Sequence, residues 1–442
     1  MSASLLEKQS TGGAIARVGF EYQDAFVLRS LPLWLSQSAF SHIVSEALSD
    51  IEVCYFSSEK SLHVMYEAKN HSLTATEFWD EIRRFKSLFD THPKNFIWFN
   101  LVCPSYNTAI SPLISKIDRL RGVGSSYDDD SSVSVNGRSE YLDWCVGKKI
   151  DFSLAEFALD YVGFITFNSE NSESIFLSEI QDTINIELLR SQVKQLKDQF
   201  KNLISRSSSG PIYRKDYENL ICQALGKERD QWLCSPIKIN LFTSTSQYQD
   251  LNLDIRDFNG PDRAQKTSSD WNNLIKKAVS IGDFIHSSGD RRTLLIDGKQ
   301  RMSTACMLGY VFSATRNFLL EIEHNGLAYR TDDHKQKEGQ FFNKIAPVEL
   351  QGETEAIVTI GFPTAIGKDI DSTINEVKSL PRLNLESSYA IDNMETLNLA
   401  VREAKSALVS FKSENKLSKL HLFIKAPSVF AMVLGHRLNG VC

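Results

Sequence analysis

Short apolar strands alternate with helical segments along the chain, and this alternation restricts the fold more than any other feature of the sequence. The pattern of the first half predicts a helix over 14–35, strands over 50–56 and 62–68, a helix that begins after Thr74 or Thr76, and a buried strand over 95–103. The two early strands are joined by a polar turn and form a hairpin. We therefore expect an α/β fold for this half.

The second half, from about Pro236, continues the same alternation. Strands are expected over 238–243, 293–297, 356–362 and 419–426, and helices are expected from Met302 and from Ser428. This order favours a parallel or mixed sheet with helices packed on it.

The second half also contains a weak internal repeat. A hydrophobic strand is twice followed by a helix with the pattern AxxLG, which spans 305–309 and, 126 residues later, 431–435. Any strand followed by a helix tends to resemble this pattern, which is one explanation. The other is a pair of duplicated Rossmann-like halves.

The overall composition limits the classes of protein to which the chain can belong. It has 442 residues with 49 basic and 55 acidic side chains, a net charge of −6 and an ordinary share of hydrophobic residues. At roughly 150 residues per domain, about two to three compact domains are expected. The mild acidity argues against a constitutive nucleic-acid coat, so any contact with DNA or RNA must come from a local basic patch.

Cysteine usage and the N-terminus predict the compartment. The seven cysteines are scattered and show no spacing typical of zinc sites, so we expect reduced core residues in a cytoplasmic protein. Residues 1–13 lack the apolar core of a signal peptide, and no run of about 18 apolar residues occurs. Neither export nor a membrane anchor is expected.

Two longer segments of the first half carry further expectations. Residues 178–204 have the pattern of one long helix, and residues 122–137, rich in Ser and Asp, that of a surface loop. One stripe of the long helix is basic and consists of Arg190, Lys194, Lys197 and Lys201. This stripe either lies against a DNA phosphate backbone or is a solvated helix face. The basic residues near the hairpin, Arg83, Arg84 and Lys86, allow the same two explanations.

The residues most suited to chemistry lie at the ends of the early hairpin. Glu46 and Asp50 stand at the entry to its first strand, and Glu67 and Lys69 at the end of its second, where residues two apart share a face. The hairpin can bring these groups together. Carboxylates hold divalent ions that activate an attacking water, and a lysine orients that water or stabilises developing charge. This set therefore suits phosphodiester hydrolysis.

Together with the neighbouring residues, these groups resemble a known domain. The run Gly19–Gln23, then Glu46 and Asp50, then Tyr66–Lys69 resembles the restriction-endonuclease-like PD-(D/E)xK domain of bacterial antiphage effectors. The stretches 294–309 and 421–437 resemble the SAVED domain that is joined to those nucleases. With both likenesses in the expected order, the chain resembles the endonuclease effectors of cyclic-oligonucleotide-based antiphage signalling (CBASS).

The resemblance implies a restriction-endonuclease-like α/β nuclease domain over 1–230, followed over 236–442 by a SAVED domain of two Rossmann-like (CARF-like) halves. It implies that a cyclic di- or trinucleotide binds the SAVED domain, drives formation of a homo-oligomer, and so activates Mg²⁺- or Mn²⁺-dependent cleavage of double-stranded DNA in the bacterial cytoplasm. In the family the chain usually continues past the last SAVED helix into a further strand, whereas this sequence ends at Cys442.

The resemblance also assigns roles to individual residues of the first half. Asp50, Glu67 and Lys69 fall on the nuclease motif. Glu46 is a further acid on the metal side, so the implied metal ligands are Glu46, Asp50 and Glu67. Gln23 is the helix residue beside the catalytic centre.

Two strand-to-helix turns of the second half are the candidate ligand site. Open α/β sheets bind ligands at such turns, where helix N-termini and flanking cations suit phosphates. The candidate residues are Lys299, Arg301, Ser303, Thr304, Lys425 and Ser428, with Trp271 as a ring that could stack on a base. Each also has an ordinary explanation as a helix cap, a surface charge or a core residue.

Two other functions remain open from the residues alone. The leading alternative is a non-catalytic nucleotide-binding regulatory protein in which Asp50, Glu67 and Lys69 form a structural ion-pair cluster. The second alternative is a nuclease that acts on RNA.

Overall fold

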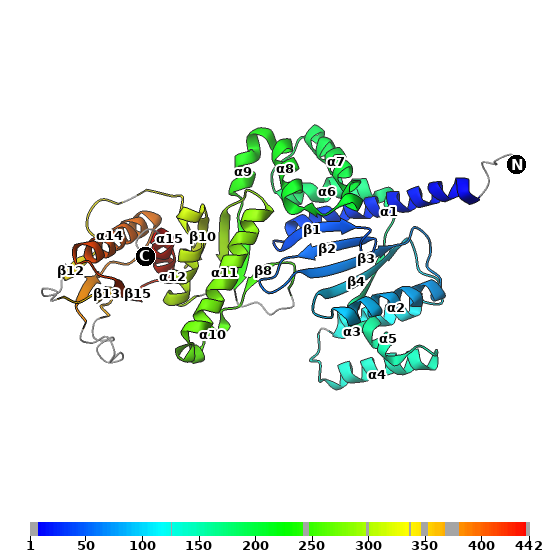
Figure 1. Cartoon of the computed structure of the whole chain (residues 1–442), viewed down its shortest axis with the longest axis horizontal. Helices are drawn as coiled ribbons and strands as arrows, with labels where there is room; N and C mark the ends of the chain where they lie inside the picture. Colours follow the sequence, from blue (N-terminus) through cyan, green and yellow to red (C-terminus); the bar gives the residue numbers. More distant parts are fainter. Residues whose placement is uncertain are drawn as a thin grey trace. The chain divides into compact units, whose positions relative to one another are not determined.

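The computed structural model describes residues 8–124, 126–241, 247–297, 300–335, 337–345, 352–366 and 380–438. The chain forms two compact units, Met1–Trp232 and Leu233–Cys442 (Figure 1). No helix among the described residues combines the length and the apolar character needed to cross a membrane.

A six-stranded sheet lies at the centre of the first unit, in the order β5-β4-β3-β2-β1-β6. Its strands are β1 (Phe40–Ser45), β2 (Ile51–Tyr55), β3 (Leu62–Ala68), β4 (Phe96–Cys103), β5 (Val162–Thr166) and β6 (Ile212–Tyr213). Strands β1, β2 and β3 pair antiparallel, whereas β3, β4 and β5 are parallel. The predicted hairpin is therefore confirmed as β2 and β3.

One face of this sheet is covered by α1 (Lys8–Ser36) (Figure 1). Phe26 and Trp34 of this helix pack against Tyr66 of β3, with ring centroids 5.3 and 5.6 Å apart. Because successive strand residues point to opposite faces, the next residue, Glu67, points away from α1.

The other face is covered by α2 (Ala75–Thr91) and α5 (Phe152–Tyr161) (Figure 1). Phe85 of α2 and Phe157 of α5 both pack on Phe99 of β4. The predicted start of α2 is confirmed, because Thr74 is its N-cap and forms a capping box with Glu77. The helix is therefore held both by its cap and by its apolar stripe.

The remaining helices of the unit correct two predictions. They are α3 (Ser111–Gly124), α4 (Ser132–Gly147), α6 (Ser172–Ile184), α7 (Arg190–Ile204), α8 (Arg214–Leu225) and α9 (Arg229–Cys234). The single helix expected over 178–204 is wrong, since Asn185 adopts a left-handed conformation with φ 53° and ends α6. The loop expected over 122–137 is also wrong at both ends, because α3 extends to Gly124 and Ser131 caps α4.

The second unit contains two separate mixed sheets. One has the order β11-β10-β9-β7-β8 and the other β12-β14-β13-β15. The strands are β7 (Ile237–Leu241), β8 (Leu251–Leu253), β9 (Thr293–Asp297), β10 (Leu319–His324), β11 (Leu327–Arg330), β12 (Asn343–Ile345), β13 (Glu355–Gly361), β14 (Arg382–Glu386) and β15 (Lys419–Lys425). In each sheet only one described strand, β11 or β12, runs antiparallel to its neighbour.

Two helices, one from each half, join these halves. The helices of the unit include α10 (Arg256–Asn259), α11 (Ser268–Ser288), α12 (Met302–Val311), α14 (Met394–Glu414) and α15 (Ser428–Arg437). Helices α12 and α15 carry the two AxxLG segments and pack against each other. The expected two halves are present as two separate sheets, and each AxxLG segment follows a strand of a different sheet.

Candidate active site

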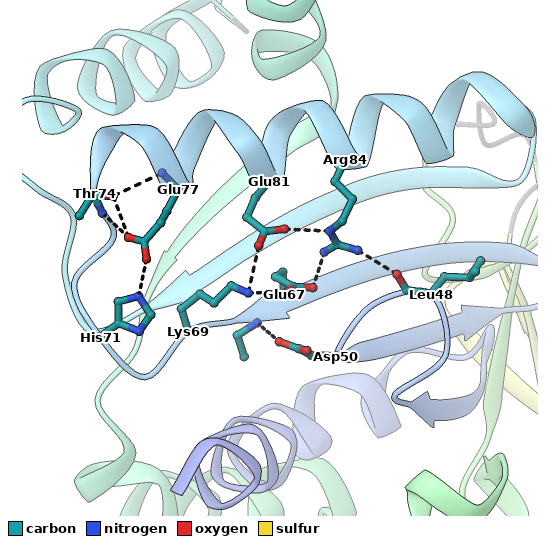
Figure 2. A network of polar contacts seen from close by, with 10 residues as sticks. Leu48, Asp50, Glu67, Lys69, His71, Thr74, Glu77, Glu81 and Arg84 are labelled. Carbon is teal, nitrogen blue, oxygen red and sulfur yellow. Dashed lines mark hydrogen bonds and ion pairs between the residues drawn. The ribbon is translucent and has the colours of Figure 1, made fainter. Parts of the chain in front are cut away.

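The turn between β1 and β2 positions Asp50. Glu46 donates its backbone N–H to the carbonyl of Asp50 at 3.1 Å, which closes the turn. Asp50 Oδ2 then accepts the backbone N–H of Ala68, at the end of β3, at 2.7 Å (Figure 2). This bond fixes the carboxylate against the strand that carries Glu67.

The end of β3 positions Glu67 and Lys69. The backbone N–H of Lys69 donates to the carbonyl of Val102 at 2.8 Å, so the β3–β4 pairing continues to this residue. Lys69 Nζ lies 2.8 Å from Glu67 Oε1. The structure thus brings together the acid and the amine that the sequence places two residues apart.

Helix α2 adds two residues that were not assigned to the site. Lys69 Nζ also lies 3.0 Å from Glu81 Oε1, and Arg84 Nε lies 2.8 Å from Glu81 Oε2. Arg84 Nη2 donates to Glu67 Oε2, and Arg84 Nη1 donates to the carbonyl of Leu48 at 2.9 Å (Figure 2). Glu81 and Arg84 are three residues apart beside the apolar stripe of α2, and this spacing is the signal that could have identified them.

Asp50, Glu67 and Lys69 lie close enough to influence one another electrostatically. Burial and the negative charge of Glu67 raise the pKa of the Asp50 carboxyl to about 6. Burial by itself lowers the pKa of Lys69, but its hydrogen bonds and charge interactions with Glu67 and Glu81 outweigh this and raise that pKa above its usual value. Lys69 therefore stays protonated at neutral pH.

Glu46 and Gln23 lie differently from the expected arrangement. Glu46 is exposed and has a positive φ of 59°, although its charge contributes to the raised pKa of Asp50. The expected set of three metal ligands is not assembled: within the described ranges, no three His, Cys, Asp or Glu side chains are grouped closely enough to hold a metal ion. Gln23 lies on α1, and among the described residues no hydrogen bond or ion pair joins it to the cluster.

The basic stripe expected along 190–201 forms on α7, but two of its members are paired. Lys197 Nζ lies 2.9 Å from Glu173 Oε2, and Lys201 donates to the other oxygen of the same carboxylate. Arg190 and Lys194 are exposed. Among the described residues, the part of the stripe that is not paired with Glu173 is thus its N-terminal half, Arg190 and Lys194.

The candidate ligand turn before α12 is partly described. Lys299 lies outside the described residues. Arg301 is the N-cap residue of α12 and donates its backbone N–H to Asn259 Oδ1 at 3.1 Å. Ser303 is exposed, whereas Thr304 is fully buried and its hydroxyl has no hydrogen-bond partner among the described residues.

The turn before α15 and the aromatic candidate are also described. Lys425 is the last residue of β15, and Pro427 rather than Ser428 is the N-cap of α15, so Ser428 begins the helix. Trp271 packs edge-on against Phe258 of α10, with ring centroids 4.8 Å apart.

Comparisons with known proteins identify both units. Residues 11–208 match the family model described as Cap4, dsDNA endonuclease domain, and residues 280–442 match the SMODS-associated and fused to various effectors sensor domain (SAVED). CD-NTase-associated protein 4 of Acinetobacter sp. (strain ATCC 27244 / 9458) is 94% identical over 442 residues, which are 100% of this chain and 96% of the relative. The chain belongs to the CD-NTase-associated protein 4 family.

Solved structures of this family have the same fold. The Acinetobacter baumannii Cap4 SAVED/CARF-domain containing receptor with the cyclic trinucleotide 3′3′3′-cAAA has a TM-score of 0.91 and 92% sequence identity, over 96% of this chain and 94% of that chain. The same receptor with 2′3′3′-cAAA gives the same values, with a TM-score of 0.91, 92% identity and coverage of 96% and 94%. The expected fold class is confirmed.

Family membership decides between the functions left open by the residues. The chain is a CBASS effector that combines a double-stranded DNA endonuclease domain with a SAVED sensor domain. It is a DNA endonuclease, so the alternative of a non-catalytic regulatory protein is wrong. The ion pair that this alternative required is nevertheless present between Glu67 and Lys69.

Proposed function

We propose that this endonuclease depends on a divalent metal ion, Mg²⁺ or Mn²⁺, and that Asp50, Glu67 and Lys69 carry the cleavage. The observation that supports this most is the electrostatic coupling of these three side chains at the end of β3. Two carboxylates and one protonated amine at one point form the minimum set for metal-assisted phosphodiester hydrolysis.

The chemistry of the donor set fits a hard divalent cation. Asp50 and Glu67 offer carboxylate oxygens, and Mg²⁺ is commonly bound by one or two carboxylates while several water ligands remain. Burial and the negative charge of Glu67 raise the pKa of Asp50, and a cation between the two acids relieves their mutual repulsion. Such an ion would lower the pKa of an attacking water and stabilise charge on the scissile phosphate.

Lys69 then acts through its charge. Because its pKa is raised, the ammonium does not accept a proton at neutral pH and is suited to donate hydrogen bonds to water or to a phosphate oxygen. Glu46 and Gln23 take supporting roles in this proposal, Glu46 as an acid at the rim and Gln23 as a polar residue of α1.

Plasmid cleavage tests the catalytic assignment. We expect Lys69→Ala to slow cutting by about 10²-fold or more, the size of effect of removing one preorganised charge donor. Lys86→Ala is the matched control, since Lys86 lies on α2 but pairs with Asp90 at 2.9 Å. Cutting by Lys69→Ala at the rate of this control would remove Lys69 from the mechanism.

We propose that the activator is a cyclic trinucleotide bound at the turns before α12 and α15. Similar receptors have been solved with 3′3′3′-cAAA and 2′3′3′-cAAA. The buried unpartnered hydroxyl of Thr304 and the helix N-terminus beside Arg301 provide polar groups there. Trp271 packs on Phe258 of α10, and the backbone N–H of Arg301 donates to the next residue, Asn259. Trp271 and Arg301 therefore contact consecutive residues of the same helix.

A thermal-shift experiment tests this site. We expect 3′3′3′-cAAA to raise the Tm of the wild-type chain, because a ligand that binds only the folded state stabilises it. Arg301→Ala should shrink the shift, whereas Lys337→Ala, which removes an exposed charge elsewhere in the unit, should not. Equal shifts in all three proteins would place the ligand away from α12.

We also propose that the activator drives formation of a homo-oligomer, in the bacterial cytoplasm. The low net basicity of the chain supports this, because several weak DNA contacts acting together produce avidity. Light scattering with and without 3′3′3′-cAAA should show a larger mass in its presence. A monomer that cuts DNA at full rate would contradict this part of the proposal.

A further inference from the structure

Four charged side chains, those of Glu67, Lys69, Glu81 and Arg84, form a closed ring (Figure 2). Glu67 gives one oxygen to Lys69 and the other to Arg84, and Glu81 does the same. The ring therefore carries no net formal charge. Lys69 belongs to the proposed chemistry, but Arg84 and Glu81 have no role in it so far.

The ring places a positive charge where a metal ion would bind. Glu67 is only 7% exposed, and both of its oxygens already accept hydrogen bonds from cationic groups. A dication that approaches Glu67 is repelled by Arg84, and this repulsion is weakly screened at a buried site. Arg84 and a metal ion thus compete for the same carboxylate.

The contacts of Arg84 also determine how firmly it is held. One nitrogen donates to the Leu48 carbonyl and another to Glu81, so two groups besides Glu67 retain the guanidinium. Its side chain is 37% exposed, and water can solvate the guanidinium when it leaves Glu67. Arg84 can therefore exchange between Glu67 and solvent while Glu81 keeps it nearby.

We propose that Arg84 is a positioning residue that competes with the active-site divalent cation for Glu67, and that Glu81 offsets this competition with its negative charge. This inference rests on the proposed metal dependence. It predicts effects of opposite sign: loss of the positive charge strengthens cation binding, and loss of the negative charge weakens it.

Titration of the full chain with Mn²⁺ in the absence of DNA tests the inference by calorimetry. We expect Arg84→Met to bind Mn²⁺ at least about tenfold more tightly than wild type, because one charge about 6 Å from a dication has a Coulomb effect of this size even in a water-like dielectric. Glu81→Gln should bind more weakly by a similar factor. Arg83→Met is the matched control, because Arg83 pairs with Asp80 on the exposed side of α2.

The outcomes separate this inference from the proposed function. Binding of Mn²⁺ by wild type but not by Glu67→Gln would support the proposed metal site. If Arg84→Met then binds Mn²⁺ no more tightly than Arg83→Met, the competition between Arg84 and the metal ion is overturned. If wild type binds no Mn²⁺, the proposed metal dependence fails together with the inference. A merely structural role of Arg84 and Glu81 would weaken binding in both variants. If Arg84→Met does not fold, Arg84→Gln and Glu81→Gln carry the same test.

Discussion

Gly309 and Gly435 lie at the crossing of α12 and α15, each against the backbone of the other helix. A Cβ on Gly435 would lie 2.1 Å from the carbonyl oxygen of Cys306, and a Cβ on Gly309 would lie 2.0 Å from that of Met432. Both distances are far below a van der Waals contact, so only glycine permits this approach. The two AxxLG segments are thus the two sides of one helix contact.

Gly435→Ala should therefore destabilise the second unit by about 1–3 kcal/mol, because the helices must separate to admit a methyl group. Calorimetry of the full chain measures the effect as a lower Tm. Gly122→Ala in α3 is the control, since a Cβ there meets nothing within 4 Å and a helical alanine is favoured. If both variants melt like wild type, the helices do not cross as closely as the structure shows.

Asp50 should make stability depend on pH. Its pKa is raised to about 6 in the folded chain, against about 3.9 when unfolded, so the folded state binds the extra proton between these values. The contribution of Asp50 to stability therefore falls as pH rises from about 4 to about 6. Asp50→Asn removes this penalty and should raise the Tm at pH 7.5 in EDTA, with a smaller gain at pH 4.5.

The exposed Asp143→Asn is the matched control for this pH series and should follow the wild-type curve. Addition of Mg²⁺ should raise the Tm of wild type and not that of Asp50→Asn, because only the wild type retains the carboxylate pair. A lower Tm of Asp50→Asn at pH 7.5 in EDTA would contradict the raised pKa.

Arg214 should be essential for the first unit. It is 5% exposed, donates to the carbonyls of Leu35 and Gln37 at the end of α1, and pairs with Glu218 at 2.8 Å. Arg214→Met leaves the Glu218 charge buried without its partner, which should cost about 3–5 kcal/mol in urea unfolding. Arg214→Met with Glu218→Leu should recover part of this loss.

Lys215→Met supplies the control for that experiment, because Lys215 is the next residue and is exposed. Its unfolding free energy should stay within about 0.5 kcal/mol of wild type. An equal effect of the two single variants would mean that the buried pair contributes nothing specific.

The N-terminal half of the α7 stripe should contribute most to DNA binding. Arg190 and Lys194 are exposed, whereas Lys197 is paired with Glu173. In anisotropy titrations with a DNA duplex, Arg190→Gln and Lys194→Gln should each reduce the salt slope by about 0.9. Lys197→Gln should reduce it less, and unchanged slopes in all three variants would exclude this face from the interface.

The sequence predicts the hairpin and its chemistry because both depend on short-range rules. The alternation of side chains in β2 and β3 determines which residues share a face of the sheet. That Glu67 and Lys69 lie on the same face can be predicted from this alternation alone. The ring around Glu67 could not be predicted in this way. Its closure by Glu81 and Arg84 depends on the rotation of α2 over the sheet, which the packing of Phe85 on Phe99 sets.

The two wrong predictions, a single helix over 178–204 and a loop over 122–137, have a common cause in local backbone chemistry. The apolar spacing continues across Asn185, so it predicts one helix, but a left-handed residue there changes the direction of the chain. Ser131 lies in a segment with the composition of a loop, yet serine is also a preferred N-cap. Periodicity alone does not distinguish these cases.

Every residue of the polar network around Glu67, from Leu48 to Arg84, comes from one continuous stretch of the chain. Bringing together groups so near in sequence requires little loop-closure entropy. A distant sensor consequently has no side chain of this network left to deliver in trans.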